Sequence, residues 1–121
     1  MATQELIQAY MAAWNEPDEA KRRAVLDQAW ADDATYTDPM SHAAGRDALI
    51  DLISQFQKQM PGSSIAQTSG IDEHHGRLRF AWKMQGQDGS TRMEGIDIGQ
   101  LMEDGRIQSI VGFFGPPPPA A

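Results

Sequence analysis

Three polar side chains of this sequence stand at positions where the hydrophobic pattern calls for apolar ones. Asp38 ends a short β-prone segment and is followed directly by Pro39. Tyr10 lies in the apolar stripe of a predicted amphipathic helix. Asp97 lies on the strand face opposite two isoleucines, and a glycine stands two residues before it and two residues after it. We expect these glycines to leave open volume around the Asp97 carboxyl group.

If Tyr10, Asp38 and Asp97 meet in one apolar cavity, they can transfer protons. Burial raises the pKa of a carboxyl group, so one aspartate could act as a general base while the other stays protonated and donates a hydrogen bond. A buried tyrosine hydroxyl supplies a second donor for a developing oxyanion. The chemistry indicated is enolisation, the removal of a proton next to a carbonyl group, without a metal or a cofactor.

Each of the three residues also has a purely structural interpretation. Asp38 can start a turn, because Asp-Pro pairs are common there. The Asp97 carboxyl group can bond to the backbone or face solvent, and Tyr10 can be a core residue whose hydroxyl is satisfied. The catalytic hypothesis therefore depends on all three side chains converging.

Other residues are candidates for a substrate pocket. His42 is predicted in a loop over the pocket mouth, where it would shuttle protons, bind substrate or simply face solvent. The aromatic residues belong first to the core, and we expect some of them to line a ligand cavity: Trp14, Tyr36, Phe56, Trp82 and Phe113. His74 and His75 stand at a predicted turn without a spaced set of metal partners, so no zinc site is predicted. The basic run 21–23 is interpreted as a solvated helix face.

The hydrophobic period changes from about four residues to two near residue 63. Before that point the pattern predicts a helix capped by Thr3, a second helix capped by Asn15, a strand over 34–38 and a third helix from Gly45 to Met60. After it, three hairpin signals separate four antiparallel strands, over 63–74, 77–86, 91–102 and 106–114. The fold class predicted is α+β, with three N-terminal helices packed on a mainly antiparallel sheet.

Composition excludes several functions. The chain has 121 residues, enough for a single domain, and a net charge of -7, which argues against nucleic acid and anionic membranes as partners. Cysteine is absent, so thiolate chemistry is excluded. The N-terminal residues lack the basic region and apolar run of a signal peptide, and we expect a cytoplasmic protein.

Four segments carry a family resemblance. Residues 31–39 (Ala-Asp-Asp-Ala-Thr-Tyr-Thr-Asp-Pro) and 45–50 (Gly-Arg-Asp-Ala-Leu-Ile) resemble the middle of SnoaL-like and ketosteroid-isomerase-like proteins. Residues 95–98 and 103–108 are similar to a later part of the same superfamily, which has the nuclear transport factor 2-like fold. The resemblance covers a single domain over 1–115 and leaves 116–121 as a flexible, Pro-rich tail.

The resemblance implies a cone-shaped α+β barrel, in which a strongly curved sheet surrounds a cavity for an apolar small molecule, and commonly a homodimer. In ketosteroid isomerases the general base is an Asp of an Asp-Pro pair, which corresponds to Asp38, and the oxyanion hole corresponds to Tyr10 and a protonated Asp97. In SnoaL-like polyketide cyclases the acid/base Asp corresponds to Asp97. A non-catalytic ligand-binding or dimerisation module is the alternative. An epoxide hydrolase of the limonene type would need an arginine between two acids, a pattern that Arg92 matches poorly.

Overall fold

The computed structural model describes residues 2–121. Three helices lie in the N-terminal half: α1 (Thr3–Asn15), α2 (Glu19–Ala29) and α3 (Arg46–Gln59). The strands are β1 (Trp30–Asp38), β2 (Ser41–Ala44), β3 (Ser64–Gln67), β4 (Asp72–His74), β5 (Arg77–Gln85), β6 (Thr91–Leu101) and β7 (Ile107–Phe114). The α+β prediction is confirmed.

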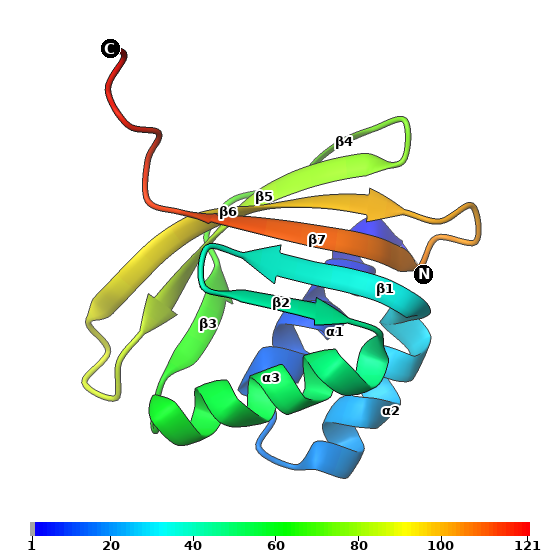
Figure 1. Cartoon of the computed structure of the whole chain (residues 1–121), viewed down its shortest axis with the longest axis horizontal. Helices are drawn as coiled ribbons and strands as arrows, with labels where there is room; N and C mark the ends of the chain where they lie inside the picture. Colours follow the sequence, from blue (N-terminus) through cyan, green and yellow to red (C-terminus); the bar gives the residue numbers. More distant parts are fainter. Residues whose placement is uncertain (1) are drawn as a thin grey trace.

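One sheet contains every strand of the described chain, in the order β2-β1-β7-β6-β5-β3, with β4 paired to β5. β1 and β7 are parallel, and the other pairs are antiparallel, so the sheet is mixed. The three helices lie together on one side of this strongly twisted sheet (Figure 1). β2 and β3 end the order without pairing to each other, so the closed barrel that the resemblance implied is not seen among residues 2–121.

The helix caps differ from the sequence prediction. Ala2, with no side-chain bond, precedes α1, and Thr3 is its first residue. Asp18 caps α2, because its carboxylate accepts hydrogen bonds from the backbone N–H groups of Ala20 and Lys21. Asn15 instead exchanges two hydrogen bonds with the backbone of Ile65, at 2.7 and 2.8 Å, and so ties the end of α1 to β3.

Two strand predictions also need correction. β1 starts at Trp30 rather than at residue 34, because the chain becomes extended directly after α2. A register shift between Trp30 and Thr35 places two successive aspartates at exposed positions, which conceals the strand pattern. The predicted loop after Pro39 contains β2, and the predicted strand 63–74 is divided into β3 and β4.

The core lies between the helices and the sheet. Its largest fully buried side chains include Ile7, Leu26, Trp30, Leu49, Ile53, Phe80, Ile107 and Ile110. Arg22 is only 2% exposed, against the prediction of a solvated basic face. Its guanidinium donates to the carbonyl oxygens of Glu16 and Ile50 and to the Ser54 hydroxyl, so it fixes α2 against α3. No helix among residues 2–121 is long and apolar enough to span a membrane.

Candidate active site

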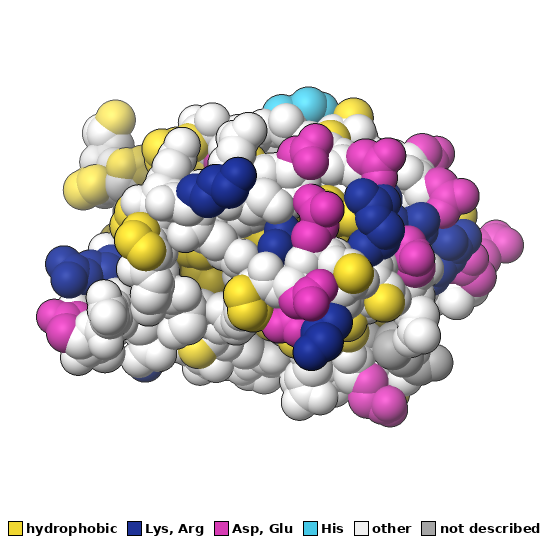
Figure 2. Space-filling view, turned by 90° about the horizontal axis from the view of Figure 1, so that it is seen from below, with side chains coloured by type: hydrophobic (Ala, Val, Ile, Leu, Met, Phe, Trp, Pro, Cys, Tyr) yellow, Lys and Arg dark blue, Asp and Glu magenta, His cyan; other side chains and the backbone are white. Residues whose placement is uncertain are grey.

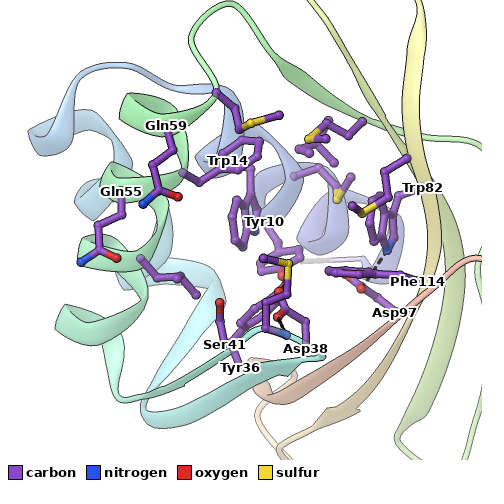
Figure 3. Close-up of a pocket in the computed structure, with 18 residues that line it drawn as sticks. Tyr10, Trp14, Tyr36, Asp38, Ser41, Gln55, Gln59, Trp82, Asp97 and Phe114 are labelled. Atoms are coloured by element: carbon purple, nitrogen blue, oxygen red, sulfur yellow. Dashed lines mark hydrogen bonds between the residues drawn. The ribbon is translucent and has the colours of Figure 1, made fainter.

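A cavity of about 560 Å³ opens between the helices and the inner face of the sheet (Figure 3). This volume lies within the usual range of small-molecule sites. Tyr10 from α1, Asp38 from the end of β1 and Asp97 from the middle of β6 all line it. The structure therefore brings the three candidate catalytic side chains into one cavity.

Gly112 lies beside both Asp97 and Asp38. β7 lies between β1 and β6, and Gly112 is the cross-strand partner of Asp97. A Cβ atom on Gly112 would stand 2.9 Å from Oδ1 of Asp97 and 3.5 Å from the Cβ of Asp38. A side chain at this position would crowd the Asp97 carboxyl group, so Gly112 leaves the space that this group occupies.

Asp38 is held by two hydrogen-bond donors. The Tyr36 hydroxyl donates to Oδ2 at 2.7 Å, and the backbone N–H of Met40 donates to Oδ1 at 2.8 Å. The bond to Met40 is the turn contact expected of an Asp before a proline. Asp38 therefore shapes the turn and lines the cavity, and each of its two carboxylate oxygens accepts one hydrogen bond.

Asp97 has a different environment. It is 5% exposed, and its one recorded donor is Nε1 of Trp82, 2.9 Å from Oδ1. Burial raises the pKa of Asp97 to about 7; the Trp82 hydrogen bond opposes this shift, and the charge of Asp38 adds to it. Near neutral pH the Asp97 carboxyl group is consequently protonated in a large share of the molecules.

Tyr10 remains a neutral hydrogen-bond donor. It is 1% exposed, and its ring stacks on Trp30 with centroids 5.6 Å apart and an interplanar angle of 10°. Burial raises the pKa of the Tyr10 hydroxyl well above its usual value, and the nearby Asp97 carboxyl group raises it further. Because burial and the Asp97 charge both disfavour the tyrosinate, the Tyr10 hydroxyl keeps its proton and can donate a hydrogen bond.

The glycines beside Asp97 do not provide the open volume that the sequence suggested. A Cβ on Gly95 would overlap the indole ring of Trp82. A Cβ on Gly99 would lie 3.0 Å from Ile110 and 3.1 Å from Leu78. Gly95 instead lets the Trp82 ring lie against β6, where its Nε1 reaches Asp97.

Of the predicted pocket residues, Trp14, Tyr36, Phe56 and Trp82 line the cavity, and His42 and Phe113 do not. Side chains alternate along a strand. In β2, Ser41 faces the cavity while His42 turns to the other face and lies 2.8 Å from the Thr37 hydroxyl. In β7, Phe114 faces the cavity, and Phe113 is 55% exposed on the outer face. His42 was misplaced because β2 was predicted as a loop.

Sequence reasoning missed several lining residues. Phe114 could have been found from strand alternation with Gly112. Gln55 and Gln59 could have been found from their helical spacing with Phe56. The other missed members include Met84 and Met93, which alternate with Trp82 and Asp97, and Leu52 and Met60, which stand four residues from Phe56. The rest are Met11, Met40, Ser41 and Ile65.

No cluster of three or more histidine, aspartate or glutamate side chains suited to a metal occurs in the described part of the chain. Arg92 lies outside the cavity, and its guanidinium is 3.7 Å from the carboxylate of Asp88. The arrangement of an arginine between two acids is therefore not formed around Asp97.

Comparisons with known proteins agree with this fold. A family model described as a SnoaL-like domain matches residues 7–110. The crystal structure of a "putative isomerase of the SnoaL-like family" from Agrobacterium tumefaciens is similar, with a TM-score of 0.89 and 32% identity over 96% of this chain and 100% of that chain. No curated protein sequence matches.

More distant structures share the fold. A "putative polyketide cyclase" from Sinorhizobium meliloti has a TM-score of 0.69 and 16% identity, over 89% of this chain and 93% of that chain. A nuclear transport factor 2-like protein of unknown function from Exiguobacterium has a TM-score of 0.73 and 18% identity, over 93% of this chain and 99% of that chain. The match to the family model and the similarity to the Agrobacterium structure show that the chain belongs to the SnoaL-like family.

Proposed function

We propose that this protein is an enzyme that enolises an apolar carbonyl compound by general acid–base catalysis. The observation that carries the proposal is the unequal environment of two neighbouring carboxyl groups. Asp38 accepts hydrogen bonds from the Tyr36 hydroxyl and the Met40 backbone, whereas Asp97 is buried with Trp82 as its donor, and burial raises its pKa to about 7. Acid and base roles follow from environments that separate two titratable groups in this way.

In the proposed reaction, Asp38 is the general base and removes a proton from the carbon next to the substrate carbonyl. The electron pair of the broken C–H bond moves toward the carbonyl oxygen, which gains negative charge. Protonated Asp97 and the Tyr10 hydroxyl donate hydrogen bonds to that oxygen. Return of the proton from Asp38 to a different carbon gives an isomer of the substrate.

The opposite assignment, with Asp97 as the base of a cyclase, has one observation in its favour. A pKa of about 7 suits a general base that works near neutral pH. The two assignments predict opposite pH profiles. If Asp97 is a donor, kcat/KM falls as the pH rises through about 7; if Asp97 is the base, kcat/KM rises over the same range.

The first experiment measures exchange of α-protons for deuterium in a panel of apolar cyclic ketones, followed by NMR. The Asp38→Asn variant should lower the exchange rate by about 10²–10⁴-fold, the usual contribution of a general base. It should still bind a phenol, which mimics the enolate. Asp33→Asn is the matched control, because Asp33 is exposed and has no recorded hydrogen bond or ion pair with a described residue.

Exchange that is unchanged in Asp38→Asn would remove Asp38 from the mechanism. A wild-type protein that binds phenols but exchanges no ketone in the panel would instead support a non-catalytic ligand-binding function. A profile in which kcat/KM rises through pH 7 and is lost in Asp97→Asn would transfer the base role to Asp97.

A further inference from the structure

Besides Asp38, Tyr36 and Ser41, the cavity has polar side chains at two places that lie apart. Asp97, Tyr10 and Trp82 are buried deep against the sheet, whereas Gln55 and Gln59 lie on the exposed side of α3. Figure 3 shows the two glutamines on the helix wall, across the cavity from Asp97 and Trp82. Apart from Asp38, Tyr36 and Ser41, the rest of the cavity is lined by apolar side chains.

Within residues 2–121, the side chains of Gln55 and Gln59 make no hydrogen bond that would stabilise the fold. No hydrogen bond joins the side-chain amide of Gln55 or Gln59 to another described residue. Gln57, on a different face of α3, behaves otherwise: its amide donates to the carbonyl oxygens of Trp14 and Glu16 at 3.0 and 2.9 Å. Gln55 and Gln59 therefore present unused amide donors and acceptors at the mouth.

Flexible apolar side chains line most of the cavity between the glutamines and Asp97. Five methionines line it, together with aromatic rings: Met11, Met40, Met60, Met84 and Met93, with Trp14, Phe56 and Phe114. Methionine side chains are flexible and polarisable and adapt to the shape of an apolar ligand. Met40 and Met60 are 81% and 39% exposed, so this lining reaches the mouth itself.

The cavity also lacks a positive charge. Among the described residues that line it, the ionisable groups are Asp38, Asp97 and two tyrosines, and none is lysine, arginine or histidine. Most charged side chains on the helical face of the molecule lie toward one end of it (Figure 2). A ligand carboxylate or phosphate would be desolvated beside Asp38 without a cation to pair with it, which is costly.

From these observations we infer that the substrate is an uncharged molecule with hydrogen-bonding groups at both ends, whose outer group binds Gln55 and Gln59. The inference rests on the proposed function for the role of the inner end. It makes the two glutamines specificity-determining residues. It also excludes substrates that carry a carboxylate, a phosphate or a coenzyme A group inside the cavity.

The test measures the binding of phenols by quenching of the fluorescence of Trp14 and Trp82, both of which line the cavity. Two pairs of probes of different length are used: naphthol against dihydroxynaphthalene, and hydroxybiphenyl against dihydroxybiphenyl, with the second hydroxyl at the far end. For at least one pair, wild-type protein should bind the dihydroxy probe about fivefold more tightly, the effect of one net hydrogen bond. A hydroxynaphthoate should bind at least about tenfold more weakly than naphthol.

The variant Gln55→Leu/Gln59→Leu keeps the side-chain size and removes the amides. It should abolish the preference for the dihydroxy probe and leave the affinity for the one-hydroxyl probe unchanged. Gln28→Leu is the control, because Gln28 is an exposed helical glutamine outside the cavity. Equal affinity for both members of both pairs in wild type, or an equal loss for both probes in the double variant, would overturn the inference, as would tight binding of the hydroxynaphthoate.

Failure of the proposed function would give a different result: the wild-type protein would exchange no ketone α-protons, while its affinities for the paired phenol probes would still be measured. The binding measurements need no turnover, so the two ideas can fail separately.

Discussion

Replacing Asp97 by asparagine should make the protein more stable at alkaline pH and not at acidic pH. The carboxyl group has a pKa of about 7 in the folded protein and an ordinary value of 3.8 when it is solvated. The folded state therefore holds a proton that the unfolded state has released between these two pH values. Because the unfolded state binds fewer protons, the free energy of unfolding falls as the pH rises through this window.

The size of the effect follows from the pKa difference. One pKa unit corresponds to about 1.4 kcal/mol, so the full shift from 3.8 to about 7 corresponds to roughly 4 kcal/mol above pH 7. The amide of asparagine does not ionise, and its oxygen can still accept the hydrogen bond from Nε1 of Trp82. Most of the stability lost to ionisation of Asp97 should thus be recovered in the variant.

The assay is urea unfolding followed by tryptophan fluorescence, at about pH 4 and about pH 8, for wild type and variant. We expect the variant to exceed wild type by about 4 kcal/mol at the higher pH and by less than about 1 kcal/mol at the lower pH. Using the difference between the two proteins cancels the titration of all other groups. Asp33→Asn, which replaces an exposed aspartate of β1, is the control for the substitution itself. A variant that is less stable than wild type at the higher pH would refute the reasoning, because it would mean that ionised Asp97 is well stabilised.

Three further changes test the site and the assembly. Gly112→Ala should fold but weaken phenol binding at least about tenfold, because its Cβ would stand 2.9 Å from Oδ1 of Asp97 and turn that carboxyl group away; unaltered binding, measured by fluorescence quenching, would contradict this. Trp82→Phe should move the alkaline limb of the kcat/KM profile to higher pH. The hydrogen bond from Trp82 lowers the pKa of Asp97, so removing this bond should raise that pKa. A limb that stays at the same pH would contradict the prediction. If the homodimer expected from the resemblance uses the outer face of the sheet, Phe113→Asp should give a monomer by light scattering, and a dimer that persists would exclude that face.

The fold could be predicted from the sequence wherever the hydrophobic period was regular. α3 and the strands β5, β6 and β7 fall within one or two residues of their predicted bounds, because each presents a continuous buried face. The errors lie where tertiary contacts replace the local pattern. β2 has four residues, too few for a period, and it is held by its pairing with β1.

Polar residues were harder to assign than apolar ones. Arg22 reads as part of a solvated basic run, and only the backbone oxygens and hydroxyl that converge on it in the folded protein explain its burial. The convergence of Tyr10, Asp38 and Asp97 could be inferred from their faces and from the family resemblance. The role of Gly112 could not, because it depends on β7 lying between β1 and β6, which is a property of the sheet order.

The stability argument for Asp97 also bears on function. Keeping this carboxyl group in an apolar cavity destabilises the folded protein near neutral pH, and two glycines within β-strands add to that cost, since glycine in a strand is unfavourable by roughly 0.5–1 kcal/mol. Gly95 admits the Trp82 ring that donates to Asp97, and Gly112 admits the carboxyl group itself. An apolar side chain at position 97 would fill the same space without these costs. A site at which several residues each lower the stability of the fold is expected to be a functional site. Gly95, Gly112 and the Trp82 indole are arranged around the Asp97 carboxyl group, and this arrangement supports the proposal that Asp97 acts in the site.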